Sequence, residues 1–261
     1  QKSPPGWYST RSTPMKSSSP PEILLRNGES LDLFMGGRLK VIQSKGGYRF
    51  SSDAVLLSEF VTVKPGDVIV DLGTGCGVIP LILLALRNPE RIIGVEIQKD
   101  LASQAHRNAR INRLGKRIDV VVGDIRDLPI AEACADVVIC NPPYRKAKSG
   151  RINPDRRRAV ARHEILADLN DVLHAARRLL REKGRVALIY PAVRLADVMT
   201  GMRRMNMEPK RVRTVHPDIR SAAKLSLIEG VLAGRPGLKL GPPLIGQGGS
   251  FIKSPSGKPA S

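Results

Sequence analysis

Aromatic residues are scarce in this sequence: Phe, Trp and Tyr make up 3% of the 261 residues. So few aromatic side chains argue against a broad stacking surface of the kind that binds single-stranded nucleic acid. Long apolar runs are missing as well, since the longest, over residues 78–86, is far shorter than the ~20 residues that a helix needs to cross a bilayer. We therefore expect no membrane-spanning helix.

Cysteine and histidine are also few. The three cysteines, Cys76, Cys134 and Cys140, show no C-x-x-C spacing and fall in or beside expected buried elements. Such thiols are typical of a reducing compartment, which predicts a cytoplasmic protein without disulfides. The four histidines are scattered and form no metal-ligand pattern, so we expect no metal site.

Acidic residues are outnumbered by basic ones. The chain has 43 Lys and Arg against 24 Asp and Glu, a formal net charge of +19. A one-sided charge of this size is typical of proteins that bind polyanions such as nucleic acids. A surface adapted only for solubility rarely needs it.

The two ends of the chain differ in composition from its middle. Residues 1–21 are rich in Ser, Thr and Pro and contain no acid, which predicts a disordered leader, and they lack the apolar stretch of a signal peptide. Residues 234–261 contain twelve Gly or Pro among 28 residues, which predicts a mostly irregular tail. Residues 22–233 alternate between apolar runs and helical patterns, and we expect them to form one domain.

The middle of the chain has the pattern of an α/β protein. The helix expected over 168–180 has Asp168 as its N-cap and Gly184 as its stop. A final β pair has no helix between its strands, which places one antiparallel strand in the sheet. The pattern predicts a doubly wound, mostly parallel seven-stranded sheet with one antiparallel strand, of the Rossmann-like type. Strands are expected over 68–72, 91–96, 118–124, 135–140, 186–190, 211–216 and 224–231, and further helices over 78–86 and 195–205.

A glycine-rich loop follows the first of these strands. Gly73, Gly75 and Gly77 permit positive φ and let backbone N–H groups approach a ligand closely. The spacing is G-x-G-x-G, whereas dinucleotide-binding folds use G-x-G-x-x-G for a pyrophosphate. Asp71 precedes the first glycine by two residues. A carboxylate there repels a pyrophosphate and attracts an ammonium group, such as that of a methionine moiety.

Three successive strands end in an acid: Asp71, Glu96 and Asp124. Glu96 occupies the position from which such folds bind ribose hydroxyls. Asp124 is suited to accept a hydrogen bond from the amine of an adenine. Any one of these acids could be a helix cap or a turn residue, but the three together with the glycine loop predict a cofactor site.

The sequence Asn141-Pro142-Pro143-Tyr144 follows the fourth expected strand. The Asn141 side-chain oxygen and the Pro142 carbonyl can each accept a hydrogen from a planar amine, which aims the nitrogen lone pair at a methyl donor. The prolines stiffen the loop, and Tyr144 offers a ring for stacking. Such a tetrapeptide can also be a simple turn. After this glycine loop, however, it predicts transfer of a methyl group from S-adenosylmethionine to an amino group.

These motifs resemble those of the class I N-P-P-Y methyltransferases, and in particular the bacterial tRNA(Val) adenine-37 N(6)-methyltransferases. The likeness covers about residues 30–245 and includes residues 45–60, 94–98, 161–164 and 208–213. It implies S-adenosylmethionine as cofactor and tRNA as partner. It implies catalytic roles for Asn141, Pro142, Pro143 and Tyr144. It implies cofactor contacts for Phe50, Asp53, Asp71, Gly73, Thr74, Gly75, Gly77, Glu96 and Asp124. His163 lies in a matching segment but has no evident chemical role.

A basic segment follows the N-P-P-Y motif directly. Between residues 145 and 162 there are eight Lys or Arg and one acid. A charge run is often only a solvated surface, but its place beside the motif favours contact with RNA phosphates. The expected contacts are Lys146, Lys148, Arg151, Arg156, Arg157 and Arg158. The alternative footprint is the basic helix around Arg177, Arg178 and Arg181, or the leader.

Three other functions share part of this pattern. A protein glutamine N(5)-methyltransferase of release factors uses the same two motifs, but in that family a helical domain of about seventy residues precedes the glycine loop. A DNA adenine methyltransferase normally carries a target-recognition insert, and none is visible. A non-catalytic RNA-binding protein built on the same scaffold is a further alternative. The presence of Asp71, Glu96, Asp124 and Asn141 argues against it, because such a protein would not need them. The sequence makes no prediction of the oligomeric state.

Overall fold

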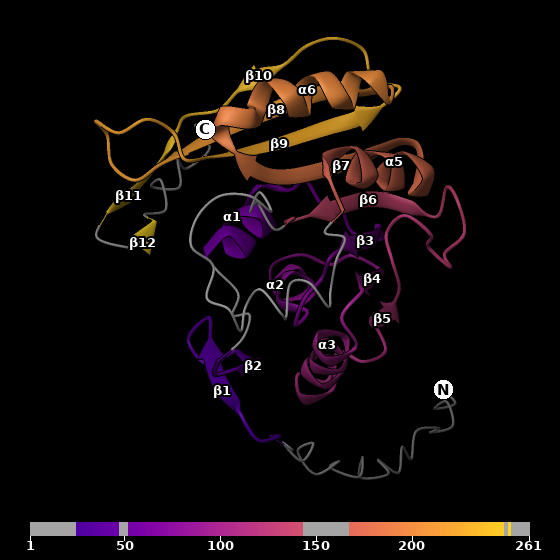
Figure 1. The fold of residues 1–261 in the computed structure, drawn as a ribbon, viewed down its shortest axis with the longest axis vertical. Helices are drawn as coiled ribbons and strands as arrows, with labels where there is room; N and C mark the ends of the chain where they lie inside the picture. Colours follow the sequence, from indigo (N-terminus) through magenta and orange to yellow (C-terminus); the bar gives the residue numbers. More distant parts are fainter. Residues whose placement is uncertain (1–24, 47–51, 143–166, 248–249, 252–261) are drawn as a thin grey trace, which may run out of the picture.

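The computed structural model describes residues 25–46, 52–142, 167–247 and 250–251. The leader expected over residues 1–21 lies outside these residues. The described part is built on one twisted sheet with helices on both of its faces (Figure 1). A separate β-hairpin, β1 (Glu29–Phe34) and β2 (Leu39–Ser44), packs beside the sheet on one helix.

Seven strands make the body of the sheet, in the order β5, β4, β3, β6, β7, β9, β8. Strand β9 runs antiparallel to both of its neighbours, and the five strands from β5 to β7 are parallel. This arrangement confirms the predicted fold class. The strands are β3 (Val68–Leu72), β4 (Arg91–Glu96), β5 (Ile118–Val122), β6 (Ala135–Cys140), β7 (Leu180–Pro191), β8 (Met207–His216) and β9 (Leu225–Leu232).

Alternate side chains of the central strands enter two separate cores. Ile69 and Ile139 pack into the core on one face, and Val70 and Val138 into the core on the other. Both faces are covered, which explains why these strands read as continuous apolar runs. The first face is covered by α1 (Ser52–Phe60), α2 (Val78–Leu86) and α3 (Lys99–Ile111), the second by α5 (Leu169–Leu179) and α6 (Leu195–Arg204). No helix in the described ranges is long and apolar enough to span a membrane.

The junction between α5 and β7 differs from the prediction. Asp168 is the N-cap of α5, as expected, and forms a capping box with Asp171. The strand, however, begins at Leu180 instead of residue 186, because Leu180 already pairs with Ala135 across a bulge. Gly184 therefore does not stop the helix. A Cβ there would come within 2.8 Å of the Arg181 carbonyl oxygen, so the close approach of two backbones requires glycine.

The first part of the Gly/Pro-rich tail adds short strands to the sheet. Strands β10 (Lys239–Leu240) and β11 (Leu244–Gln247) both pair in parallel with β8, and β12 (Ser250–Phe251) pairs with β11. The prediction of a mostly irregular tail did not include these strands. These short strands form because the edge of β8 is open to pairing. The residue pattern within the tail itself gives no sign of that distant edge. Residues 252–261 lie outside the described part.

The hairpin is attached to α3 by side-chain amides. Asn108 accepts a hydrogen bond from the Ile42 amide (2.7 Å) and donates to the Ile42 carbonyl (3.0 Å). One turn later, Asn112 bonds the amide and carbonyl of Lys40 in the same way, at 2.9 and 2.7 Å. The two asparagines thus satisfy an outer edge of β2 that would otherwise be open.

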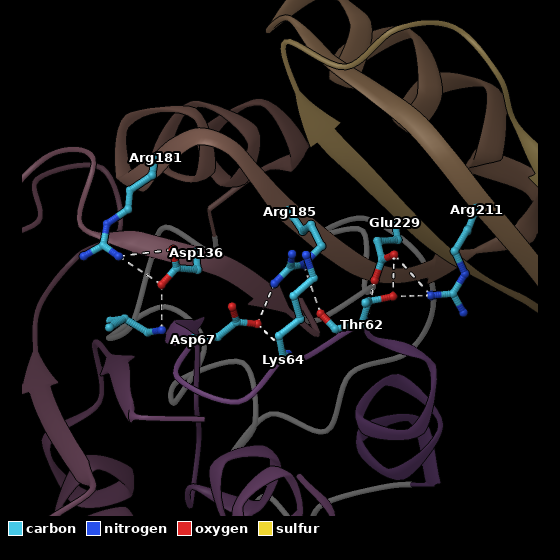
Figure 2. A network of polar contacts seen from close by, with 9 residues as sticks. Thr62, Lys64, Asp67, Asp136, Arg181, Arg185, Arg211 and Glu229 are labelled. Atoms are coloured by element: carbon cyan, nitrogen blue, oxygen red, sulfur yellow. Dashed lines mark hydrogen bonds and ion pairs between the residues drawn. The ribbon is translucent and has the colours of Figure 1, made fainter. Parts of the chain in front are cut away.

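A polar network joins the amino ends of the strands (Figure 2). Asp67, before β3, pairs with Arg185 of β7 at 2.5 Å, and Asp136 of β6 pairs with Arg181 at 3.0 Å. Glu229 of β9 accepts from the Thr62 amide at 2.6 Å and from Arg211 at 3.1 Å. These bonds fix residues 61–67, which connect α1 with β3 at this edge. The opposite edge of the sheet is built differently.

Candidate active site

The predicted cofactor residues meet at the carboxyl ends of the parallel strands. Leu72 of β3 lies in register with Val95 of β4 and with Cys140 of β6, and Glu96 lies beside Val122 of β5. The glycine loop, Glu96, Asp124 and Asn141 therefore leave neighbouring strands at one edge. Ligands of open α/β sheets bind at this edge.

All three glycines of the loop have positive φ: 73° for Gly73, 58° for Gly75 and 81° for Gly77. At Gly77 a Cβ would lie 3.0 Å from the Ala105 Cβ, so this glycine also allows the loop to pack on α3. At Gly73 a Cβ would meet nothing within 4 Å. That backbone thus borders open space where a ligand can approach.

Hydrogen bonds hold the loop in place. The amides of Gly73 and Thr74 both donate to the Val95 carbonyl at 2.9 Å. Asn108 donates to the carbonyl of Cys76 at 2.9 Å, and it also carries the hairpin. The loop is consequently shaped by the protein before any ligand binds.

Asp71 is fully buried directly below this loop. Its Oδ2 accepts from the Thr74 hydroxyl at 2.7 Å, whereas its Oδ1 has no hydrogen-bond partner among the described residues. Burial raises the pKa of Asp71 to about 7, and the nearby charge of Glu96 adds to this effect. A buried acceptor without a donor is costly, and an ammonium group is the partner that would satisfy it.

Glu96 is buried at the end of β4 and is held by backbone amides. Gly75 donates to its Oε2 and Gln98 to its Oε1, both at 2.9 Å. Burial raises the pKa of Glu96, and these amides oppose the rise. Each carboxylate oxygen keeps a second lone pair, so Glu96 can still accept from a diol.

Two further predicted contacts have different surroundings. Asp124 forms an ion pair with Arg126, which holds the pKa of the Asp124 carboxyl below its usual range. Asp53 lies in the first turn of α1. Because α1 ends near the amino edge of the sheet, its first turn faces the edge with the glycine loop.

Asn141 and Pro142 follow β6 directly, and Pro142 is buried. Their strand neighbour is Leu72, so Asn141 departs beside Gly73. This register places the first residues of the predicted catalytic motif, Asn141 and Pro142, next to the glycine loop. The remaining predicted residues lie outside the described part of the chain: Phe50, Pro143, Tyr144, Lys146, Lys148, Arg151, Arg156, Arg157 and Arg158, together with His163.

The sequence prediction missed three residues of this edge. Ile97 and Val122 are apolar yet 53% and 48% exposed, and they flank the ends of β4 and β5 beside Glu96. They are suited to the faces of an adenine ring. Their signal was an apolar residue within two positions of a strand-end acid. Asn108 was signalled only by its spacing of four from Asn112.

Among the described residues no group of three or more His, Cys, Asp or Glu could hold a metal ion.

Comparisons with known proteins agree with this geometry. A family model described as a methyltransferase domain matches residues 63–227. The chain is 36% identical over 173 residues to a tRNA1(Val) (adenine(37)-N6)-methyltransferase of Porphyromonas gingivalis, covering 63% of this chain and 67% of that protein. It is 34% identical over 151 residues to the Tolumonas auensis protein of the same name, covering 57% of this chain and 62% of that one.

Solved structures share the fold. A predicted O-methyltransferase from Agrobacterium tumefaciens superposes with a TM-score of 0.62 at 21% identity, covering 78% of this chain and 92% of that one. A geranyl diphosphate C-methyltransferase from Streptomyces coelicolor gives 0.53 at 16% identity, over 69% and 77% of the two chains. The chain therefore belongs to the methyltransferase domain family, in the group of the tRNA1(Val) (adenine(37)-N6)-methyltransferases.

Proposed function

We propose that the protein transfers a methyl group from S-adenosylmethionine to the exocyclic N6 amine of an adenine in tRNA, at position 37 of a valine tRNA. The observation that carries this proposal is the buried Asp71, whose Oδ1 is unsatisfied by the described residues, below a preformed glycine loop that lies next to Asn141. The names of the relatives support the choice of tRNA and of position.

The cofactor would extend along the carboxyl edge from β3 to β5. Asp71 would bind its ammonium group, and the backbone of Gly73, Thr74, Gly75 and Gly77 would line its methionine part. Glu96 would accept hydrogen bonds from the ribose hydroxyls. Ile97 and Val122 would cover the adenine ring, and Asp124 would accept from its amine after giving up part of its pairing with Arg126. When bound, S-adenosylmethionine supplies an electrophilic methyl group on a sulfonium.

Asn141 would orient the target amine. Its side-chain oxygen and the Pro142 carbonyl accept the two hydrogens of the amine, so the nitrogen lone pair faces the methyl group. Asn141 and Pro142 would thereby hold the nitrogen toward the methyl group of the sulfonium, and water would take up one amine proton. Positioning supplies most of the rate, because the sulfonium needs no further activation. Phe50, Asp53, Pro143 and Tyr144 remain predicted members of the site.

Electrostatics would bring the tRNA to this edge. The net charge of +19 favours association with a polyanion. The six basic residues between Lys146 and Arg158 remain predicted phosphate contacts. All three cysteines are free thiols in the structure, which supports the cytoplasm, a reducing compartment, as the location.

Methyl transfer from tritiated S-adenosylmethionine tests the proposal. We expect label in total tRNA, recovered as N6-methyladenosine after nucleoside digestion, and none in purified release factor. Asn141→Ala is the negative control. Label in a glutamine of the release factor would overturn the choice of substrate. Binding of RNA without binding of S-adenosylmethionine would overturn the enzyme itself.

A further inference from the structure

Two adjoining turns at the carboxyl edge have no part in the site described above. The first is the 3-10 turn Ala192–Arg194 after β7, and the second is the connection 217–224 between β8 and β9. They lie side by side, because Pro191 pairs with Leu225 and the Ala192 amide donates to the Lys224 carbonyl at 3.0 Å. We call these two turns, together with Tyr190, the rim.

Two large apolar side chains of the rim are exposed to solvent, and hydrogen bonds hold the turn that carries one of them. Val193 is 88% exposed and Ile219 is 83% exposed, more than any other large apolar side chain of the described residues. The turn that carries Ile219 is fixed by Asp218, which accepts from the amides of Arg220 (2.8 Å) and Ser221 (3.0 Å). This turn thus holds Ile219 out in water, and the turn beside it does the same with Val193.

Cations surround these apolar side chains. Arg220 and Lys224 are exposed on the turn that carries Ile219. The Arg194 guanidinium lies over the Tyr190 ring, 6.0 Å from its centroid. Two acids lie close by: Asp197 pairs with Arg194, and Asp218 binds the amides of its own turn and keeps its negative charge. Three cations against these two acids leave a small positive net charge.

The position of the rim suits the substrate and not the cofactor. Along the edge, the cofactor residues follow β3, β4 and β5, Asn141 follows β6, and the rim follows β7 and β8. Cys140 lies in register with Leu188, so Pro142 and Tyr190 are each two residues beyond a paired position on adjacent strands. The rim thus borders Asn141 on the side away from the cofactor residues.

We propose that the rim is the docking surface for the RNA strand next to the target adenine. Val193 and Ile219 would pack against riboses and base faces, Arg220 and Lys224 would contact phosphates, and the stacked Tyr190 and Arg194 would support one base. A protein partner is disfavoured because two isolated aliphatic side chains fall far short of a standard interface. This proposal rests on the proposed function, because it takes tRNA as the substrate.

The first experiment compares Ile219→Asp with Leu33→Asp. Leu33 is a matched control, since it is also exposed and apolar (67%) but lies on the hairpin. Equilibrium binding of the tRNA substrate is measured by fluorescence anisotropy, without methyl transfer. We expect Ile219→Asp to weaken tRNA binding about fivefold or more, because it adds a negative charge beside phosphates. Leu33→Asp should change it less than about twofold.

The second experiment removes the cations. Arg220→Ala and Lys224→Ala should each reduce the slope of log affinity against log salt by about 0.7 to 0.9. Melting temperature and S-adenosylmethionine binding, measured on every variant, should match the wild type because all the replaced side chains are exposed and none is a predicted cofactor contact.

Three outcomes would overturn the rim as an RNA surface: unchanged tRNA binding by Ile219→Asp with unchanged salt slopes, an equal loss in Leu33→Asp, or a dimer in sedimentation that only the rim variant dissociates. The last outcome would assign the rim to a second copy of the chain. Failure of the proposed function looks different. In that case the wild-type protein would methylate no tRNA, while tRNA binding by the variants would still decide the role of the rim.

Discussion

The two edges of the sheet both contain buried acids, and the two sets differ in their partners. At the amino edge the buried Asp67 and Glu229 and the half-buried Asp136 each face an arginine (Figure 2). At the carboxyl edge Asp71 and Glu96 are bonded by a hydroxyl and by backbone amides, and burial raises the pKa of both carboxyls.

This contrast separates structural acids from acids held for a ligand. An arginine neutralises an acid permanently and fastens two parts of the chain together. A hydroxyl or an amide orients an acid but leaves its charge uncompensated, which destabilises the ligand-free protein and favours a cationic ligand. The position of an acid at the carboxyl edge does not by itself determine whether the acid has an arginine partner, since Asp124 lies at that edge and pairs with Arg126.

The largest expected effect is on stability, at the amino edge. Arg185→Leu leaves the mostly buried Asp67 without its partner, and we expect the free energy of unfolding to fall by about 3–5 kcal/mol. The control is Arg91→Leu, whose pair with Asp119 is exposed, so its loss should leave the free energy of unfolding almost unchanged. Urea denaturation measures both. Equal losses in the two variants would mean that burial does not distinguish these pairs.

The next effect is on turnover, at the carboxyl edge. Asn141→Ala should lower the rate of methyl transfer on the order of 10²-fold or more, because one charge-localising acceptor is removed from the target amine. The dissociation constant of S-adenosylmethionine should stay within a few fold. Rate measurements at saturating cofactor check this. More than a tenth of wild-type turnover would contradict the role of Asn141.

Replacing a carboxylate by an amide, first at the carboxyl edge and then at the amino edge, tests the comparison of the two edges directly. Asp71→Asn keeps the shape but removes the charge that faces the ammonium, and should weaken cofactor binding about tenfold to a hundredfold. Asp67→Asn, at the other end of the same strand, should leave the dissociation constant unchanged while lowering stability. Isothermal titration calorimetry tests both variants. An unaltered constant for Asp71→Asn would make Asp71 a turn residue.

The smallest effect is a pH dependence of cofactor binding. Asp71 has a pKa of about 7 before the ligand binds, so below that pH it is protonated and must release a proton to pair with the ammonium. Affinity should thus weaken as pH falls, by about tenfold per unit well below pH 7, and level off above it. Calorimetry in buffers of different ionisation enthalpy would detect the released proton. The Asp71→Asn variant should show neither the slope nor the release.

The same comparison bears on the alternative RNA footprint around Arg177, Arg178 and Arg181. Helix α5 ends at Leu179, against the start of β6. Arg178 donates to the Leu128 carbonyl at 2.7 Å, and Arg181 pairs with Asp136. Arg178 and Arg181 therefore serve the fold toward the amino edge, whereas Arg177 is exposed and stays part of the alternative prediction.

The fold could be predicted closely because its signals are local. Apolar runs from Val68 to Leu72 and from Ala135 to Cys140 need no distant residue to be recognised as buried strands, and Asp168 caps its helix through Asp171, three residues away. The tail strands and the extended β7 were missed because each depends on a partner strand elsewhere in the chain.

The sequence by itself determined the order of the strands along the chain, the glycine loop, and the acids and Asn141 at the strand ends. Only the tertiary structure decided which acids lack a cationic partner. A carboxylate is neutralised by any cation that lies close to it in the folded protein, however far away in the sequence. Asp67 and Asp71 lie four residues apart in the sequence. Arg185 reaches the first, and the second is sealed below the loop with one oxygen unbonded.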